Sequence, residues 1–160
     1  LIHKVETLSL PEQLVKEAEY TEAMKIYKET ADRIKTDPNA AIHETARMKW
    51  YRGVVKRFEE QKINPNPKYE MELHVLRIGD VAVCTNEFEL FLDYGIRIQS
   101  RSKALQTITI QLVGPGTYLP TEKAYKGGGY SAVAESIDVG PEGGQILVDR
   151  TVELINGIFP

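Results

Sequence analysis

The chain has 160 residues, of which 42% are hydrophobic and 27% charged, and its net charge is -3. This composition is ordinary for a globular protein and is sufficient for one domain, or a fragment of one, over residues 1–160. The slightly acidic balance, without a basic stripe, excludes a general attraction to nucleic acid. No run of about eighteen apolar residues exists, so we expect no transmembrane helix. The first five residues include His3 and Lys4, so we also expect no signal peptide.

Cys84 is the only cysteine. A single thiol excludes an internal disulfide and a cysteine-based zinc site, and it does not define a compartment. Because Val81 and Val83 lie beside it in an apolar run, we expect Cys84 to be a core residue rather than a reactive thiol.

Residues 9–62 have the pattern of a helical hairpin. Ser9 to Glu12 matches a capping box with Pro11 in the first turn, and apolar residues then recur at helical spacing to about Lys35. A second helix is predicted from Asp37-Pro38 to about Lys62, before two prolines that cannot continue it. So short a connection favours antiparallel helices, which we expect to lie on a sheet.

Residues 69–157 have the pattern of an α/β segment. Residues 69–78 alternate between apolar and polar, Gly79-Asp80 predicts a turn, and residues 81–84 form a short buried strand. Asn86 and Glu89 match a helix cap for a helix from Phe88 to Arg101, and residues 107–113 form the next strand. This order of strand, helix and strand favours a right-handed βαβ unit, in which the two strands are parallel. We therefore predict an α/β fold, with α+β as the alternative, in which helices flank a mixed sheet of about three or four strands.

The segment 121–157 adds two further helices to this prediction. Thr121 caps a short helix over residues 122–125, a flexible Gly127-Gly128-Gly129 segment follows, and Gly140-Pro141 opens a last helix.

Two polar residues follow buried strands of the predicted sheet. Glu87 comes after residues 81–84, and Tyr118 comes after residues 107–113 and a Gly-Pro-Gly turn. Ligands collect at the carboxyl edge of strands in open α/β sheets. A carboxylate there can bind a metal, although Glu87 is equally explained by a favourable position at a helix N-terminus. The three histidines are isolated, and no serine-hydrolase or phosphate-loop motif is present.

Two stretches resemble the C-terminal part of the catalytic domain of the neutral/alkaline (non-lysosomal) ceramidases. They are residues 81–88 with Gly95-Ile96-Arg97, and residues 117–125 with Gly128-Gly129-Tyr130; the resemblance covers about residues 76–156. In that family a glutamate after a strand and a later tyrosine ligate zinc, and a tyrosine twelve residues further on faces the substrate carbonyl. The resemblance therefore implies Glu87 and Tyr118 as zinc ligands and Tyr130 beside the scissile amide.

The same resemblance implies that this chain holds half of a site. The family's two histidine ligands and its nucleophilic serine come from an N-terminal half that these 160 residues do not contain. Zinc normally needs about four ligands, of which at least three come from protein, so zinc should bind weakly or not at all to this chain alone. The implied parent is a zinc-dependent amidohydrolase that cleaves N-acyl sphingoid lipids, secreted or periplasmic, and this chain alone should be inactive. The start at Leu1 rather than Met agrees with a processed or truncated product.

Two other functions stay open. The hairpin carries Trp50-Tyr51 with Tyr20 and Tyr27, which suits a non-catalytic binding or assembly module, although such aromatics more often belong to a core. Alternatively, Thr85-Asn86 and Gly114-Pro115-Gly116 depart from the ceramidase pattern, as expected of a degenerate relative that has lost the metal. Oligomeric state and the exact lipid are not predicted.

Overall fold

The computed structural model describes the backbone of all 160 residues and every side chain except that of Pro38. The chain divides into two compact units. One comprises residues 1–13 and 68–160, and the other residues 14–67, so that the second unit is inserted between two strands of the first. Together they have the mixed α/β composition that the sequence predicts.

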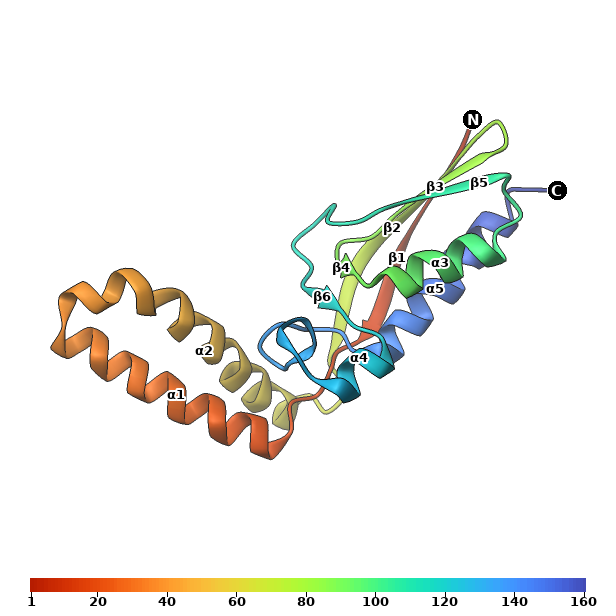
Figure 1. Cartoon of the computed structure of the whole chain (residues 1–160). Helices are drawn as coiled ribbons and strands as arrows, with labels where there is room; N and C mark the ends of the chain where they lie inside the picture. Colours follow the sequence, from red (N-terminus) through yellow and green to blue (C-terminus); the bar gives the residue numbers. More distant parts are fainter. The chain divides into compact units, whose positions relative to one another are not determined.

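The first unit contains a mixed four-stranded sheet with the order β1-β2-β3-β5 (Figure 1). Strands β1 (Ile2–Pro11), β2 (Lys68–Ile78) and β3 (Val81–Thr85) are antiparallel in turn. Strand β5 (Gln106–Ile110) pairs with β3 in parallel, as predicted for this strand, helix and strand unit. Gly79, with a φ of 61°, makes the tight turn between β2 and β3.

Strand β1 is a correction to the sequence prediction. The capping box at Ser9 to Glu12 does not begin a helix, because residues 2–11 pair along the whole of β2. Leu8 and Leu10 alternate into the core of this unit, so strand pairing and burial outweigh the local capping signal. The first helix, α1 (Glu17–Thr36), begins seven residues later than predicted.

Two helices cover one face of the sheet. Helices α3 (Leu92–Arg101) and α5 (Pro141–Asn156) pack on each other, and α5 lies against β1 and β2. They enclose a core that includes Leu10, Met71 and Leu73 from the sheet. Cys84 is 1% exposed in this core, which confirms its predicted place; burial raises the pKa of its thiol.

The connection between β3 and α3 also differs from the prediction. No helix begins at Phe88; instead Glu89–Leu90 forms a short strand, β4, and α3 starts at Leu92. Asn86 is 1% exposed, and its side-chain oxygen accepts a hydrogen bond from the backbone N–H of Phe88 at 3.0 Å. That bond makes a turn rather than a helix cap, because the chain then pairs with β6 (Tyr118–Leu119), a parallel strand the sequence did not reveal.

The last third of the unit follows the sequence more closely. Strand β5 ends at Ile110, three residues before the predicted end. Helix α4 (Glu122–Gly127) is capped by Thr121, whose hydroxyl accepts a hydrogen bond from the N–H of Ala124, as predicted. A short 3-10 helix, η2 (Tyr130–Ala132), follows, and α5 begins at Pro141 as expected.

The second unit is the predicted helical hairpin, within slightly different bounds. Helix α1 and helix α2 (Ala41–Ile63), joined by the 3-10 helix η1 (Pro38–Ala40), pack along each other. The side chain of Gln61 bonds both backbone groups of Val15, which secures the entry to the hairpin. Tyr20 stacks on Phe58 with 4.2 Å between ring centroids, so this tyrosine belongs to the hairpin's packing.

Candidate functional site

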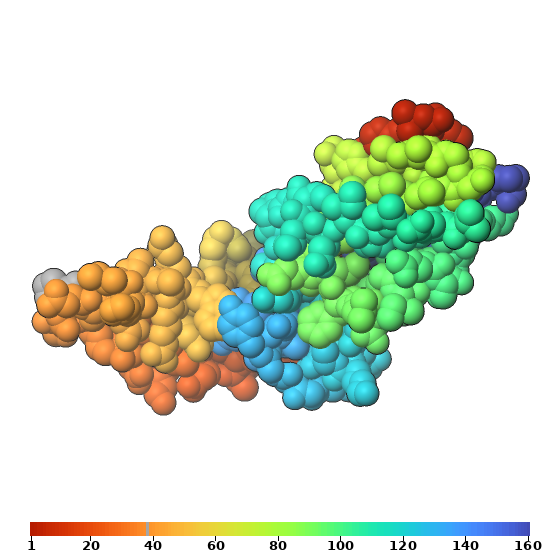
Figure 2. Space-filling model, turned by 45° about the horizontal axis from the view of Figure 1, so that its top comes forward, coloured from red at the N-terminus to blue at the C-terminus, as the bar shows by residue number. Residues whose placement is uncertain are grey.

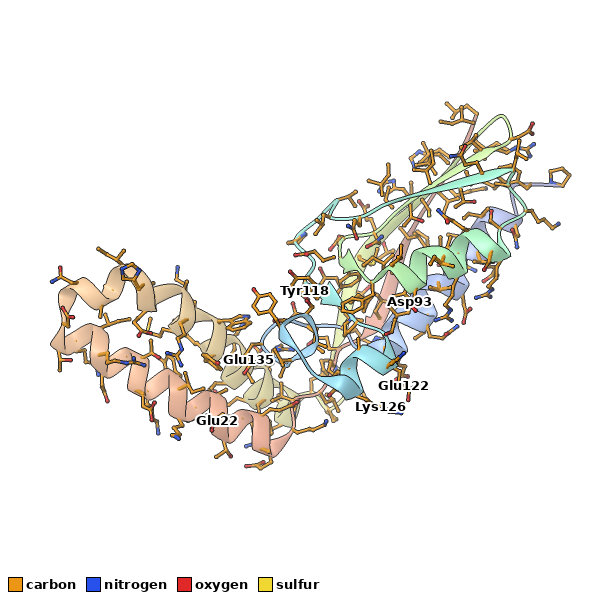
Figure 3. All side chains as sticks on the ribbon, in the orientation of Figure 1. Glu22, Asp93, Tyr118, Glu122, Lys126 and Glu135 are labelled. Carbon is orange, nitrogen blue, oxygen red and sulfur yellow. The ribbon has the colours of Figure 1, made fainter. Side chains whose placement is uncertain are left out.

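The candidate site is built on the two-stranded ribbon of β4 and β6. Its parallel register places Glu89 directly opposite Tyr118. The ribbon is held by backbone hydrogen bonds from Glu89 N–H to Thr117 and from Tyr118 N–H to the carbonyl of Ser136, at 3.0 and 3.2 Å. These bonds fix Tyr118 at the edge of the first unit, where Figure 3 labels it beside β6.

The phenol of Tyr118 has polar partners on two sides. Glu89 and Ser131 both affect its ionisation, Glu89 by raising and Ser131 by lowering the pKa of Tyr118. The bond to Glu89 is the largest cause of a raised pKa for Tyr118, because ionisation would place two negative charges side by side. Tyr118 is therefore a neutral phenol at neutral pH.

Tyr130 lies against Tyr118. The two rings are 5.9 Å apart between centroids and nearly perpendicular, with an interplanar angle of 78°. Tyr130 begins η2, and Gly128 and Gly129 before it have φ values of 71° and 110°, which side-chain-bearing residues rarely adopt. The glycine segment that the sequence marked as flexible thus makes the turn that brings Tyr130 back to Tyr118. Tyr130 itself is 67% exposed.

Glu87 has a different neighbour. Its carboxylate oxygen Oε2 accepts a hydrogen bond of 2.7 Å from the hydroxyl of Tyr69 on β2. Burial, followed by the bond to Glu87, raises the pKa of Tyr69. Glu87 does not lie at a helix N-terminus, as one of the two sequence interpretations required, because α3 begins five residues later.

The Gly114-Pro115-Gly116 turn packs directly on Glu87. A Cβ atom at Gly114 would lie 2.6 Å from Cγ of Glu87, and one at Gly116 would lie 2.5 Å from its carbonyl oxygen. A side chain at Gly116 would require a shift of the backbone, whereas one at Gly114 would displace the side chain of Glu87. The turn that departs from the ceramidase pattern therefore has a packing role at the predicted metal ligand.

The structure brings together two of the three predicted site residues, Tyr118 and Tyr130. The carboxylate opposite Tyr118 belongs to Glu89, while Glu87 accepts a hydrogen bond from Tyr69. Sequence reasoning missed Glu89 because it fitted a helix cap, and a two-residue strand carries too little alternation to be recognised.

A shallow hollow of about 380 Å³ lies between β4, β5 and α3. Leu90, Ile96 and Gln111 are among the residues that line it, and neither site tyrosine is. The candidate site is therefore separate from this hollow.

Within the part of the chain that the structure describes, no group of three or more histidine, cysteine, aspartate or glutamate residues could hold a metal ion. Glu89 and Tyr118 offer two oxygen donors, which suit zinc as part of a ligand set but do not complete one. None of the described helices is both long and apolar enough to cross a membrane. Comparison of the chain with family models, curated proteins and solved structures finds no match.

Proposed function

We propose that this chain is the C-terminal part of a zinc-dependent amidohydrolase similar to the neutral ceramidases, inactive by itself. The observation that carries the proposal is the contact between Tyr118 and Tyr130, at 5.9 Å between ring centroids. The spacing of Tyr118 and Tyr130 in the sequence is the most specific point of the resemblance to the ceramidases. A site of that kind also requires the two tyrosines to lie close together in space.

Each residue of the pair has a distinct role in this proposal. Tyr118, with a carboxylate, contributes oxygen ligands to the metal, and Tyr130 donates a hydrogen bond to the amide carbonyl as negative charge develops on its oxygen. Bound zinc would supply Lewis-acid polarisation of that carbonyl and a lowered pKa for the attacking hydroxyl. The histidine ligands and the nucleophile come from the missing N-terminal half, the partner that this proposal implies. The substrate is a lipid amide.

Two carboxylates compete for the role of metal ligand. The resemblance names Glu87, whereas the pairing of β4 with β6 supports Glu89, which lies opposite Tyr118 and raises the pKa of its phenol. Glu87 would first have to give up its hydrogen bond from Tyr69. Both glutamates remain candidate ligands in the proposal, and mutating each one in turn distinguishes between them.

The test joins the chain to its upstream sequence and measures zinc affinity by titration. Tyr118→Phe should weaken zinc binding by about tenfold or more, and so should either Glu87→Gln or Glu89→Gln, whichever carboxylate is the ligand. Glu122→Gln, on α4, is the matched control and should change nothing. Zinc affinity that is unaffected by Tyr118→Phe and by both glutamate variants would remove the metal role.

A non-catalytic binding role for the hairpin has one supporting observation. Trp50 and Tyr51 meet edge to face at 5.7 Å on α2, and the Arg47 guanidinium lies 6.0 Å from the Tyr51 ring. Both rings are half-buried, so this cluster presents some aromatic surface. If the fluorescence of Trp50 is blue-shifted and resists quenching by acrylamide, the side chain is buried, and this result would argue against a binding role for the hairpin. The degenerate-relative alternative predicts no zinc affinity in the parent at all.

A further inference from the structure

The first unit brings together two histidines that lie far apart in the sequence. His3 on β1 and His74 on β2 stack with 5.3 Å between ring centroids and an interplanar angle of 18°. The Nε2 atom of His3 lies 3.1 Å from the Nδ1 atom of His74. In the antiparallel register His3 lies opposite Leu76, two residues after His74 on β2. The two histidines are therefore diagonal neighbours on one face of the sheet, where long side chains reach each other.

This histidine pair is accessible from solvent. His3 is exposed, and the side chain of His74 is 32% exposed. Figure 2 shows the start of β1, in red, at the surface beside the yellow-green residues of β2 and β3. An ion in solution can therefore approach the pair without passing through the core.

A carboxylate orients the ring of His74. The Oε2 atom of Glu72, two residues earlier on the same face of β2, lies 3.7 Å from the Nε2 atom of His74. Its negative charge favours a proton on Nε2, which leaves a lone pair on Nδ1. The Nε2–H of His3 donates to that lone pair. Histidines that bind metals are commonly oriented in this way, with the second ring nitrogen directed at a carboxylate.

The distance between the two facing nitrogens suits two ligands of one metal ion. Zinc–nitrogen bonds are about 2.0–2.1 Å long, so two of them at a tetrahedral angle hold their nitrogens about 3.3–3.4 Å apart. At the right angle of a square-planar or octahedral site the separation is about 2.9 Å. The observed 3.1 Å lies between these values. Rotation of the rings aims both lone pairs at an ion beside the line that joins the nitrogens, and the proton of His3 moves to its Nδ1.

We propose that His3 and His74 form a binding site for a divalent transition-metal ion such as Zn²⁺. The two imidazoles supply two nitrogen ligands, and water completes the coordination of the ion. Two protein ligands are fewer than a tight site has, so binding is reversible and weaker than at a structural zinc site. The ion joins the edge strand β1 to β2, the two strands between which the helical hairpin is inserted. Because the ion binds only the folded arrangement, it stabilises the pairing of these strands.

Titration of the 160-residue chain with Zn²⁺ tests the proposal. Nitrogen NMR of the imidazole rings identifies the atoms that bind the ion, and calorimetry gives the affinity. Zn²⁺ is the probe because Cu²⁺ and Ni²⁺ also bind deprotonated backbone amides beside a histidine. We expect Zn²⁺ to shift the resonances of Nε2 of His3 and Nδ1 of His74, and to raise the thermal midpoint of unfolding.

Variants of the pair and of its orienting carboxylate sharpen this test. His3→Gln and His74→Gln should each weaken zinc binding by about tenfold or more, because a chelating pair becomes a single ligand. Glu72→Gln should weaken it by about tenfold and leave both ring nitrogens as ligands. His43→Gln, at an exposed position of α2, is the matched control and should change nothing. Tyr118→Phe should also change nothing, because the candidate site is a different place in the fold.

Three results would overturn the proposal. Ring nitrogens of His3 and His74 that stay unshifted at saturating Zn²⁺ would show that the pair does not bind the ion. An affinity that survives either His3→Gln or His74→Gln would show that the two rings do not act together. A loss in His43→Gln as large as in the pair variants would assign the zinc to unspecific imidazole binding. The proposed function is tested separately, in the chain joined to its upstream sequence, so neither result decides the other.

Discussion

Glu89 and Tyr118 lie opposite each other across the parallel pair of β4 and β6, and the nearby carboxylate of Glu89 raises the pKa of the phenol. Neither residue is in a long strand, yet the backbone bonds of both strands hold the pair in register. This pair is the part of the candidate site that the chain assembles without any other component.

Replacing Glu89 should lower the pKa of Tyr118. The raised pKa of the phenol is caused first by its bond to Glu89, so Glu89→Gln removes the negative charge that opposes ionisation. Titration of carbon-labelled tyrosine by NMR measures the change in the chain without zinc. Glu122→Gln, which removes the partner of Lys126 on α4 instead, should leave the pKa of Tyr118 as it is. A pKa equally high in Glu89→Gln would mean that the bond does not form in solution.

Gly144→Ala should destabilise the first unit by about 1–3 kcal/mol, because it overpacks the contact between α3 and α5. A Cβ at Gly144 would lie 2.3 Å from the hydroxyl oxygen of Tyr94. That hydroxyl is buried and donates to the carbonyl of Pro120 at 2.9 Å, and burial raises the pKa of Tyr94 to about 12. Urea unfolding monitored by circular dichroism measures the loss.

Gly95→Ala is the matched control for that substitution. Gly95 is in the interior of α3, and a Cβ there meets no atom within 4 Å. The substitution should stabilise the unit by about 0.5–1 kcal/mol, because alanine favours a helix over glycine. Equal effects of the two alanines would contradict the close packing of α5 on Tyr94.

The pair of Glu6 and Arg150 should make stability depend on pH. Two hydrogen bonds, of 2.7 and 2.5 Å, join the guanidinium on α5 to the carboxylate on β1, and the bond to Arg150 lowers the pKa of Glu6. Because the folded-state pKa is the lower one, the stabilisation is present above the unfolded value of about 4.3 and is lost as the pH falls through the folded pKa.

Glu6→Gln should therefore reduce the free energy of unfolding at pH 7 by about 0.5–1 kcal/mol, a modest amount because both side chains are about one-third exposed. At a pH below the folded-state pKa of Glu6, the variant and the natural chain should unfold at nearly the same urea concentration. A difference that stays constant between pH 7 and pH 3 would show that packing, rather than charge, links β1 to α5.

Elements with a regular hydrophobic pattern over many residues are predicted well from the sequence. The prediction fails where contacts with distant residues determine the secondary structure. The alternation of residues 69–78 and the helical period of the hairpin both give elements close to those observed. Strand β1 was missed because Ser9 to Glu12 carries a strong local capping signal, and only pairing with residues 68–77 overrides it.

In the candidate site, too, local sequence features could be predicted and long-range contacts could not. Tyr118 and Tyr130 were named together only through the ceramidase resemblance, and the glycine turn between them is local chemistry. The place of Glu87 depends on the hydroxyl of Tyr69, eighteen residues earlier, and that of Glu89 depends on β6, nearly thirty residues later. Neither contact leaves a pattern in the sequence near the glutamates.

The central claim is that Tyr130, held beside Tyr118, assists the hydrolysis of a lipid amide once the missing half is present. The most direct measurement is the rate of fatty-acid release from an N-acyl sphingoid lipid by the chain joined to its upstream sequence. Tyr130→Phe should lower kcat by about 10²–10³-fold while zinc affinity stays unchanged. An unaltered kcat in Tyr130→Phe, or the absence of any release by the joined protein, would contradict the account.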